Sequence, residues 1–384
     1  MYFVHPQIKL NNVFKAASSL IKPFHQEELI KRLSKYFPEK QFIFTDMGRS
    51  AFRVIIEKLN LQNSEMLLPA YICDIFYSIL KNYNIKPIFL DIDLNTFHVR
   101  PEEIKRKITP NSRAILICHT YGLPFDFSRF DLPRRSNLIV IEDCANSFGA
   151  KLNDVYTGNF GDISFFSLYK QFPTLRGGML VCPENWQVQL PKTLFNFRDF
   201  ISFLNYFFPF AFIFKKFGSE IAPKIPRKEK LLEPSGINQV SLNLFSDFFE
   251  DFEKSLDNRK KLALFFQAEL KKLDFEVQES KDSVFCYLSA LVPKNIAEKR
   301  NEIVQRLKKY RVFCTRIWHT PIILDEEAQK EYQINLAEFP NTLEAVKRVI
   351  NFPLQNHYTE KDVKKIVDAL KKVMMDIGYP SNGI

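Results

Sequence analysis

The sequence predicts an α/β protein in which a large three-layer domain, built on a mostly parallel sheet, precedes a smaller α+β domain. Three observations lead to this class. The 384 residues are 46% hydrophobic, so the chain can bury enough apolar surface to offset the entropy lost on folding. From about residue 45 to about residue 185, short apolar runs alternate with helical patterns, which indicates βαβ units. A long charged helical pattern follows, and we expect the domains to be residues 1–240 and 241–384.

Each element is predicted from the period of its apolar residues. A helix is expected where they recur every three to four positions, as at Phe52, Ile56 and Leu59. In the large domain we expect helices over 25–37, 49–61, 74–83 and 101–107, and strands over 66–69, 87–92, 114–118, 138–141, 163–167 and 179–182. In the small domain we expect helices over 241–273, 298–310 and 359–374, and strands over 284–292 and 312–317.

The charge of the chain excludes some classes of partner. Lys and Arg total 54 against 44 Asp and Glu, which gives a net charge of +10. The excess is spread along the chain, without zinc-finger spacing, an RNP-like motif or a basic arm. We therefore predict no nucleic-acid binding and interpret the charge as general surface charge, which also suits a phosphate-bearing small molecule.

The cysteines and the first residues predict a cytoplasmic protein. None of the six cysteines forms a C-x-x-C pair, and most lie in apolar, strand-like runs, as reduced core thiols do. The stretch from Met1 to Pro6 has neither the basic nor the apolar region of a signal peptide. We expect no metal site.

Residues 195–235 form an atypical aromatic and basic insertion. Its stretch 200–214 reads FISFLNYFFPFAFIF, which is too short to cross a bilayer and is interrupted by Pro209. We interpret this stretch as a helical hairpin packed on the core or on a second subunit. The alternative is peripheral membrane contact through the aromatic side chains and the adjoining Lys215 and Lys216.

The glycines gather where chemistry is expected. Six of the eleven lie between Gly122 and Gly178, which indicates unusual backbone or close approach of a ligand there. Gly48 opens the first long helix and is followed by Arg49 and Ser50. The N–H groups at such a helix start bind phosphate well, although Ser50 could instead simply cap the helix.

Two further positions complete a candidate site. Glu142 and Asp143 close an apolar strand, and ligands bind at the carboxyl ends of parallel strands in open α/β sheets. Lys170 follows another buried strand, where burial and a nearby cation would lower its pKa; the alternative is an ordinary surface lysine. A phosphate cradle, a strand-end carboxylate, a hydroxyl and this lysine together predict pyridoxal phosphate as the cofactor.

At these residues the sequence resembles the DegT/StrS-type sugar aminotransferases, which belong to the fold-type I pyridoxal-phosphate enzymes. The resemblance is close from about residue 45 to about residue 185 and looser from about 235 to about 375. The motifs that carry it are Gly48-Arg49-Ser50-Ala51, Thr109 to Ile115, His119-Thr120-Tyr121-Gly122-Leu123-Pro124, Glu142-Asp143-Cys144-Ala145-Asn146-Ser147-Phe148-Gly149, Gly161-Asp162, Phe166-Ser167, Lys170, Gly177-Gly178, Gly236-Ile237-Asn238 and Val349 to Val363.

The resemblance implies that residues 1–240 form the cofactor-binding domain and assigns roles within it. Lys170 would hold the cofactor covalently, and Asp143 would pair with the pyridinium nitrogen. The other residues expected to contact the cofactor are Gly48, Arg49, Ser50, Tyr71, Asn146, Ser167 and Asn238.

The resemblance also indicates which part of the cofactor some of these residues would contact. Arg49, Ser50 and Ser167 would bind the phosphate. Tyr71 would stack on the ring, although Cys73 could occupy that place. Asn146 stands where the family has His or Gln.

Other assignments concern the neighbouring subunit and the substrate. Asn238 would reach the cofactor phosphate of the neighbouring subunit, which implies a homodimer with shared active sites. Trp318 and His319 would line the sugar pocket, or else serve only as packing and cap residues.

The resemblance also implies an activity. The protein would move an amino group, with glutamate as the expected donor, to a nucleotide-linked keto-sugar used for a polysaccharide or glycan precursor. A sugar dehydratase with the same cofactor is an alternative, but such members typically have His in place of the lysine, and here Lys170 is present. The other alternative is a catalytically degenerate paralogue that acts as a structural or membrane-associated assembly partner.

Overall fold

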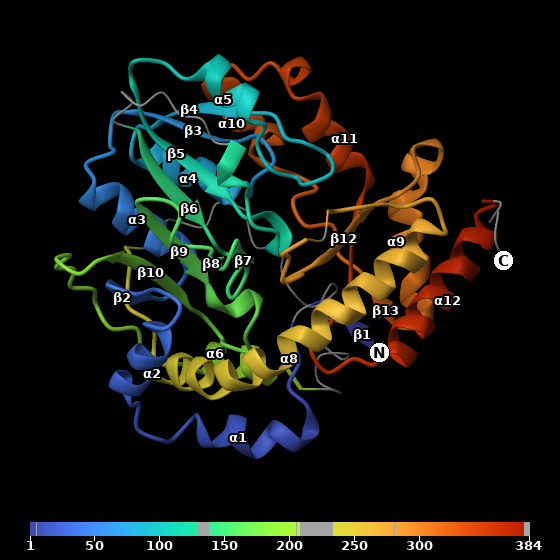
Figure 1. Ribbon diagram of the computed structural model, residues 1–384, viewed down its shortest axis with the longest axis horizontal. Coiled ribbons are helices and arrows are strands. Elements are labelled where there is room, and N and C mark those ends of the chain that lie inside the picture. The colour runs from blue at the N-terminus through green and yellow to red at the C-terminus, as the bar shows by residue number, and fades with distance from the viewer. Residues whose placement is uncertain (5, 130–137, 205, 208–232, 280, 380–384) are drawn as a thin grey trace.

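The computed structural model describes residues 1–4, 6–129, 138–204, 206–207, 233–279 and 281–379, and it confirms the α/β class (Figure 1). Its strands are β1 (Tyr2–Phe3), β2 (Lys40–Thr45), β3 (Glu65–Pro69), β4 (Lys86–Leu90), β5 (Ser112–Cys118), β6 (Ile139–Asp143), β7 (Lys151–Leu152), β8 (Val155–Tyr156), β9 (Ile163–Ser167), β10 (Gly178–Pro183), β11 (Glu276–Val277), β12 (Leu288–Leu291), β13 (Val312–Phe313) and β14 (Val349–Phe352). Its helices are α1 (Val13–Ser18), α2 (Gln26–Leu33), α3 (Gly48–Lys58), α4 (Ile75–Asn82), α5 (Pro101–Lys107), α6 (Phe197–Leu204), α8 (Gln239–Lys271), α9 (Arg300–Leu307), α10 (Glu326–Tyr332), α11 (Pro340–Arg348) and α12 (Glu360–Asp376).

A seven-stranded sheet in the order β2-β10-β9-β6-β5-β3-β4 forms the centre of the described chain. The strands from β9 to β4 are parallel, and β10 runs antiparallel to both β9 and β2. Alternate residues of β5 face opposite layers: Leu116 packs in a cluster with residues of α3 and α4, and Ile115 in a cluster with a residue of α5. Helices therefore cover both faces, which explains why the strands read as continuous apolar runs.

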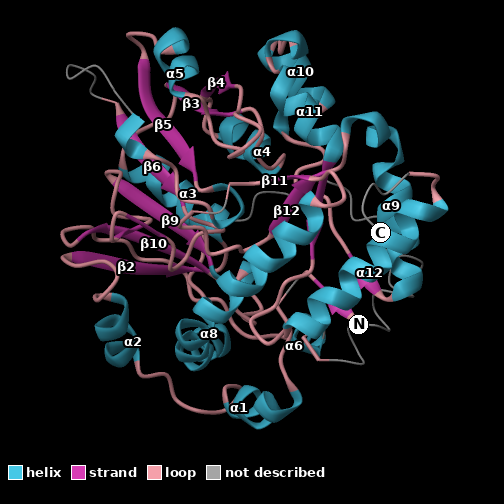
Figure 2. Cartoon of the chain, turned by 45° about the vertical axis from the view of Figure 1, so that its right-hand side comes forward, coloured by secondary structure: helices cyan, strands magenta, loops and turns pink. Residues whose placement is uncertain are grey.

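A second, smaller sheet lies on the other side of the molecule, where β11, β12 and β14 pair antiparallel (Figures 1 and 2). The long helix α8 belongs to both halves. Near its start Phe245 and Phe249 pack with Phe166 of the central sheet, and near its end Phe266 packs with Phe352 of the small sheet. In addition, β1 pairs with β13, so the first residues of the chain join its C-terminal half. The domain boundary at residue 240 stays a prediction. Helix α8 and the pairing of β1 with β13 both connect the two predicted domains across it.

The structure changes several predicted elements. The strand predicted over 284–292 is limited to Leu288–Leu291, because the N–H groups of Val284 and Tyr287 bond to the loop after β5 instead of to a strand. The strand predicted over 312–317 ends at Phe313, and the helix predicted over 25–37 is shortened to α2. No strand was predicted where β2 lies, although its apolar run Phe42-Ile43-Phe44 pairs with β10 at the edge of the sheet.

The predicted insertion lies partly outside the described residues. Of the stretch 200–214, the structure describes 200–204 and 206–207, and there Phe203 is buried in a cluster with Val240, Leu244 and Phe248. The remainder of the stretch, and the basic residues that follow it, lie outside the described residues. Among the helices that the structure describes, none is both long and apolar enough to cross a membrane.

Candidate active site

A cavity of about 390 Å³ opens where β6 and β9 end and α3 begins. It is at the carboxyl edge of the parallel strands, where the sequence predicts ligand binding. Its lining includes six of the predicted site residues: Gly48, Arg49, Asp143, Ser167, Lys170 and Trp318. The other lining residues are mainly apolar: Met47, Cys73, Ile75, Phe76, Ala145, Phe165, Tyr169, Tyr287 and Ile317.

Asp143 is the last residue of β6 and is buried. Its Oδ1 accepts a hydrogen bond from the N–H of Ala145 at 2.9 Å, and the Cys118 thiol lies 3.7 Å from Oδ2. Burial raises the pKa of this carboxyl, although Lys170 and the Ala145 N–H act in the opposite direction. A carboxylate so poorly hydrated is stabilised by a cation or a protonated ring nitrogen placed in the cavity.

Lys170 ends a short 3-10 turn, Leu168–Lys170, that directly follows β9. The prediction of a lowered pKa is wrong for this lysine. Burial does lower its pKa, but nearby Tyr169 and Asp143 outweigh burial, so the pKa is raised above its ordinary value. Acidic groups lie near Lys170, where the sequence analysis expected a cation. The alternative of an ordinary surface lysine is also wrong, because Lys170 lines the cavity.

The start of α3 forms one wall. Met47 is the N-cap residue, in extended conformation and without a side-chain cap, so the alternative role of Ser50 as the cap is wrong. Ser50 itself is buried and does not line the cavity. A Cβ added to Gly48 would lie 3.2 Å from both Phe166 O and Ser167 Cβ, which shows how closely the helix start approaches the end of β9. Such a helix start favours an anion.

Tyr71 and Asn146 lie outside the cavity lining. Tyr71 is fully buried, and its hydroxyl is 2.7 Å from that of Tyr121, whereas Cys73 does line the cavity, as the alternative assignment had it. Asn146 is buried, with its Oδ1 3.7 Å from the Cys286 thiol.

Asn238 and His319 also lie outside the lining. Asn238 caps α8, because its Oδ1 accepts from the N–H of Ser241 at 2.8 Å, while its Nδ2 is buried without a partner among the described residues. Nδ1 of His319 lies 2.9 Å from the carbonyl oxygen of Arg316, whereas its neighbour Trp318 lines the cavity in a left-handed conformation (φ 57°).

The sequence analysis missed the role of Glu142. Strand alternation turns its side chain away from that of Asp143, and its two oxygens accept from the N–H groups of Gly158, Phe160 and Gly161 at 2.6–2.8 Å. His119 Nε2 lies 2.8 Å from the same carboxylate, and His119 Nδ1 accepts from a backbone N–H. These donors and acceptors are thus already paired, so the cluster has a structural role. The dense glycines at 158 and 161 were the available signal for it.

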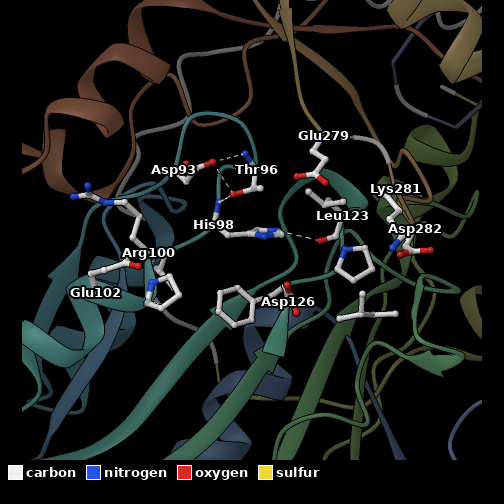
Figure 3. Close-up of a pocket in the computed structure, with 15 residues that line it drawn as sticks. Asp93, Thr96, His98, Arg100, Glu102, Leu123, Asp126, Glu279, Lys281 and Asp282 are labelled. Carbon is white, nitrogen blue, oxygen red and sulfur yellow. Dashed lines mark hydrogen bonds between the residues drawn. The ribbon is translucent and has the colours of Figure 1, made fainter. Parts of the chain in front are cut away.

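Figure 3 shows another cavity, of about 330 Å³, lined by the loops that follow β4, β5 and β11. There His98 Nε2 lies 3.1 Å from the Leu123 carbonyl oxygen, and Asp93 accepts hydrogen bonds from Thr96. No predicted site residue lines it. The arrangement of Lys170 and Asp143 therefore identifies the 390 Å³ cavity as the candidate active site.

The residues of this cavity fit pyridoxal phosphate. A primary amine, a buried carboxylate with a raised pKa, and a helix start beside Ser167 and Arg49 offer partners for its aldehyde, ring nitrogen and phosphate, respectively. The apolar side chains on the remaining wall suit an aromatic ring.

Several known proteins are similar in sequence to this chain. The chain is 26% identical over 294 residues to GDP-perosamine synthase of Escherichia coli O157:H7, which covers 73% of this chain and 75% of that one. It is 25% identical over 358 residues to dTDP-4-amino-4,6-dideoxy-D-glucose transaminase of Shigella dysenteriae, covering 91% and 90%. A GDP-4-keto-6-deoxy-D-mannose 3-dehydratase of Escherichia coli O55:H7 is 27% identical over 187 residues, covering 44% and 48%.

The fold has close counterparts among solved structures. A Streptococcus pneumoniae protein described as a sugar aminotransferase, solved in its PMP form, superposes with a TM-score of 0.75 at 17% identity, covering 98% of this chain and all of that one. The same protein has also been solved in a PLP form. The sequence profile of the DegT/DnrJ/EryC1/StrS aminotransferase family matches residues 10–371. The chain therefore belongs to the DegT/DnrJ/EryC1/StrS family of pyridoxal-phosphate-dependent aminotransferases.

Proposed function

We propose that this protein transfers an amino group from glutamate to a nucleotide-linked keto-sugar in the biosynthesis of a polysaccharide or glycan precursor. The observation that carries the proposal is the presence of Lys170 and Asp143 in one largely apolar cavity. Relatives named for GDP- and dTDP-linked sugars support the substrate class, and the net charge of +10 suits such an anion.

The residues of the cavity divide the chemistry among them. Bound pyridoxal phosphate supplies an electron sink for the carbon that loses its proton. The carboxylate of Asp143 would hold a proton on the ring nitrogen, and the start of α3 with Ser167 would anchor the phosphate. Nζ of Lys170 would hold the cofactor through its aldehyde and, when free and unprotonated, would carry the proton to and from the substrate carbon. The largely apolar lining would limit the amount of water beside the reacting carbon.

The test is a visible absorption spectrum of the protein with pyridoxal phosphate, for wild type and Lys170→Ala. We expect a band in wild type that borohydride reduction makes permanent, no such band in Lys170→Ala, and an unchanged band in Lys192→Ala, whose lysine is exposed. Keto-sugar nucleotides with glutamate as donor then test the reaction. A colourless wild type would contradict the proposal and favour a non-catalytic assembly partner.

A dehydratase is the second candidate, since a dehydratase is among the relatives. The presence of Lys170 favours transamination, because the resemblance associates dehydration with a histidine at this position. Mass analysis of the sugar product separates the two reactions: transamination introduces nitrogen, whereas dehydration removes a hydroxyl without adding nitrogen. A nitrogen-free deoxy product would favour the dehydratase.

We also propose a homodimer in which Asn238 serves the cofactor bound by the other copy. The unpartnered Nδ2 of Asn238 supports this role. Mixing inactive Lys170→Ala and Asn238→Ala chains should then restore activity, because one site of each mixed dimer is intact. Random pairing predicts about a quarter of the wild-type activity. No recovery from mixed dimers would contradict shared sites.

We propose that the protein is cytoplasmic, as its pattern of reduced thiols suggests, and that residues 200–214 make peripheral contact with a membrane. All six cysteines are free, and five of them are buried. Flotation with liposomes, compared between wild type and a chain lacking 200–214, tests the membrane contact. Equal flotation of the two would end that idea.

A further inference from the structure

A third cavity, of about 320 Å³, lies between the N-terminal segment, α8 and the loop that follows β14. It shares no lining residue with the candidate active site. We propose that this cavity binds a small oxyanion, a phosphate or a carboxylate, with Arg259 of α8 as its central ligand.

Arg259 carries a buried positive charge that the described residues do not neutralise. The residue is 4% exposed, and only Nη2 has a hydrogen-bond partner, the carbonyl oxygen of Leu354 at 3.4 Å. Nε and Nη1 are buried without a partner. Burial accordingly lowers the pKa of Arg259, since the charged form loses its hydration. A buried guanidinium left unpaired is costly, and an anion in the adjoining cavity would remove that cost.

The rest of the lining also favours an anion. Lys9 and Lys254 are exposed and add positive charge at the cavity, although the ammonium of Lys254 also pairs with Glu250. The lining contains one carboxylate, that of Asp251, and it is already paired with Lys15 at 2.9 Å. A planar guanidinium with free N–H groups binds phosphate and carboxylate oxygens strongly, which specifies the chemical class of the ligand.

The cavity is separate from the cofactor site, but residues next to Lys170 in the sequence line it. Gln171 and Phe172, the two residues after Lys170, form part of its wall. The side chain of Gln171 is held by the backbone N–H and carbonyl of Phe148, at 2.9 and 3.2 Å. An anion on Arg259 would therefore lie in a cavity whose wall includes the two residues that directly follow Lys170.

Equilibrium dialysis with radiolabelled inorganic phosphate, on protein already loaded with pyridoxal phosphate, tests the proposal at constant ionic strength. Loading occupies the cofactor's own phosphate position, so any further saturable binding is separate from it. We expect one phosphate per chain in wild type. Arg259→Gln should weaken that binding about tenfold or more, the loss expected for a buried charge-assisted contact. Arg100→Gln, at the cavity of Figure 3, should bind phosphate as wild type does.

Two further arms keep the experiment decisive. Lys9→Ala and Lys254→Ala alter exposed side chains, so they should fold normally and each weaken binding severalfold, even if Arg259→Gln does not fold. Displacement of phosphate by succinate would assign a carboxylate ligand, and the absence of displacement would assign a phosphate. The proposal is overturned if wild type shows no saturable binding, or if the lysine variants bind phosphate with unchanged affinity.

Discussion

Replacing Gly178 with alanine should damage the cofactor site, although Gly178 itself does not line the cavity. Gly178 begins β10, where it pairs with Thr45 of β2 and Ser167 of β9. A Cβ there would overlap the backbone carbonyl of Met47, well inside the 3.0 Å below which real contacts essentially do not occur. Because Met47 is the N-cap of α3, the helix start would have to move.

The size of the effect follows from the geometry. Restoring ordinary contact requires a shift of about 1 Å in the Met47 backbone. Overpacking of this kind costs about 1–3 kcal/mol of folding free energy. Because the helix start would no longer lie where it meets the phosphate, we expect the cofactor Kd to rise by about tenfold, which corresponds to about 1.4 kcal/mol.

Two other glycines give a graded comparison. At Gly48 the added Cβ would meet its nearest atoms at 3.2 Å, so Gly48→Ala should weaken cofactor binding less than Gly178→Ala. At Gly236, which bridges to the same Thr45, the nearest atom is 3.6 Å away, and Gly236→Ala should be neutral. Absorbance titration with pyridoxal phosphate gives the Kd values, and urea unfolding gives the stabilities. Equal Kd values for Gly178→Ala and Gly236→Ala would refute the reasoning.

Three further substitutions test the site and its support. Asp143→Asn should keep the covalent attachment of the cofactor but lower kcat by about 10²-fold, because a preorganised charge at the ring is lost. The borohydride assay measures the attachment and steady-state kinetics measure kcat. An unchanged kcat would contradict this role of Asp143. Glu142→Gln should cost about 2–4 kcal/mol in urea unfolding, because its new NH₂ group faces backbone N–H donors; a stability equal to that of wild type would show that the loop 158–161 does not depend on this carboxylate. Burial lowers the pKa of His98 to about 3. Below pH 6.5 the unfolded chain therefore binds a proton that the folded protein does not, so the free energy of unfolding is highest above pH 6.5 and falls as the pH falls. His98→Gln should therefore reduce the loss of stability between pH 7.5 and pH 5 by about 2 kcal/mol, and equal losses in both proteins would contradict that pKa.

The sequence was a good guide where a local pattern determines the structure. The strand predicted over 163–167 is β9 to the residue, because both of its faces are buried and its apolar run is continuous. Likewise, Asp143 and Lys170 line one cavity, since Asp143 ends one parallel strand, Lys170 closely follows the neighbouring one, and the two strand ends meet at one edge.

Prediction failed where distant contacts decide the outcome. Residues 284–287 have the apolar character of a strand, but they bond to the loop that contains Tyr121. The pKa of Lys170 depends on Tyr169 and Asp143 together, and a sequence does not show which acidic groups will surround an amine. Packing also decides which side chain meets the cavity: the Tyr71 hydroxyl lies beside that of Tyr121, while Cys73 lines the cavity.

The continuity of α8 limits how this molecule can move. Its 33 residues extend over about 50 Å and supply side chains to two separate hydrophobic cores. A hinge needs a few residues that can absorb large backbone rotations, and a regular helix with both ends embedded in packed cores has none. The two sheets are therefore expected to slide past one another by small shear displacements along the helix. Entry of a bulky substrate must then rely on movement of the loops at the mouth of the cavity. The rigid helix keeps Asn238, at its N-terminal end, at a constant distance from the small sheet.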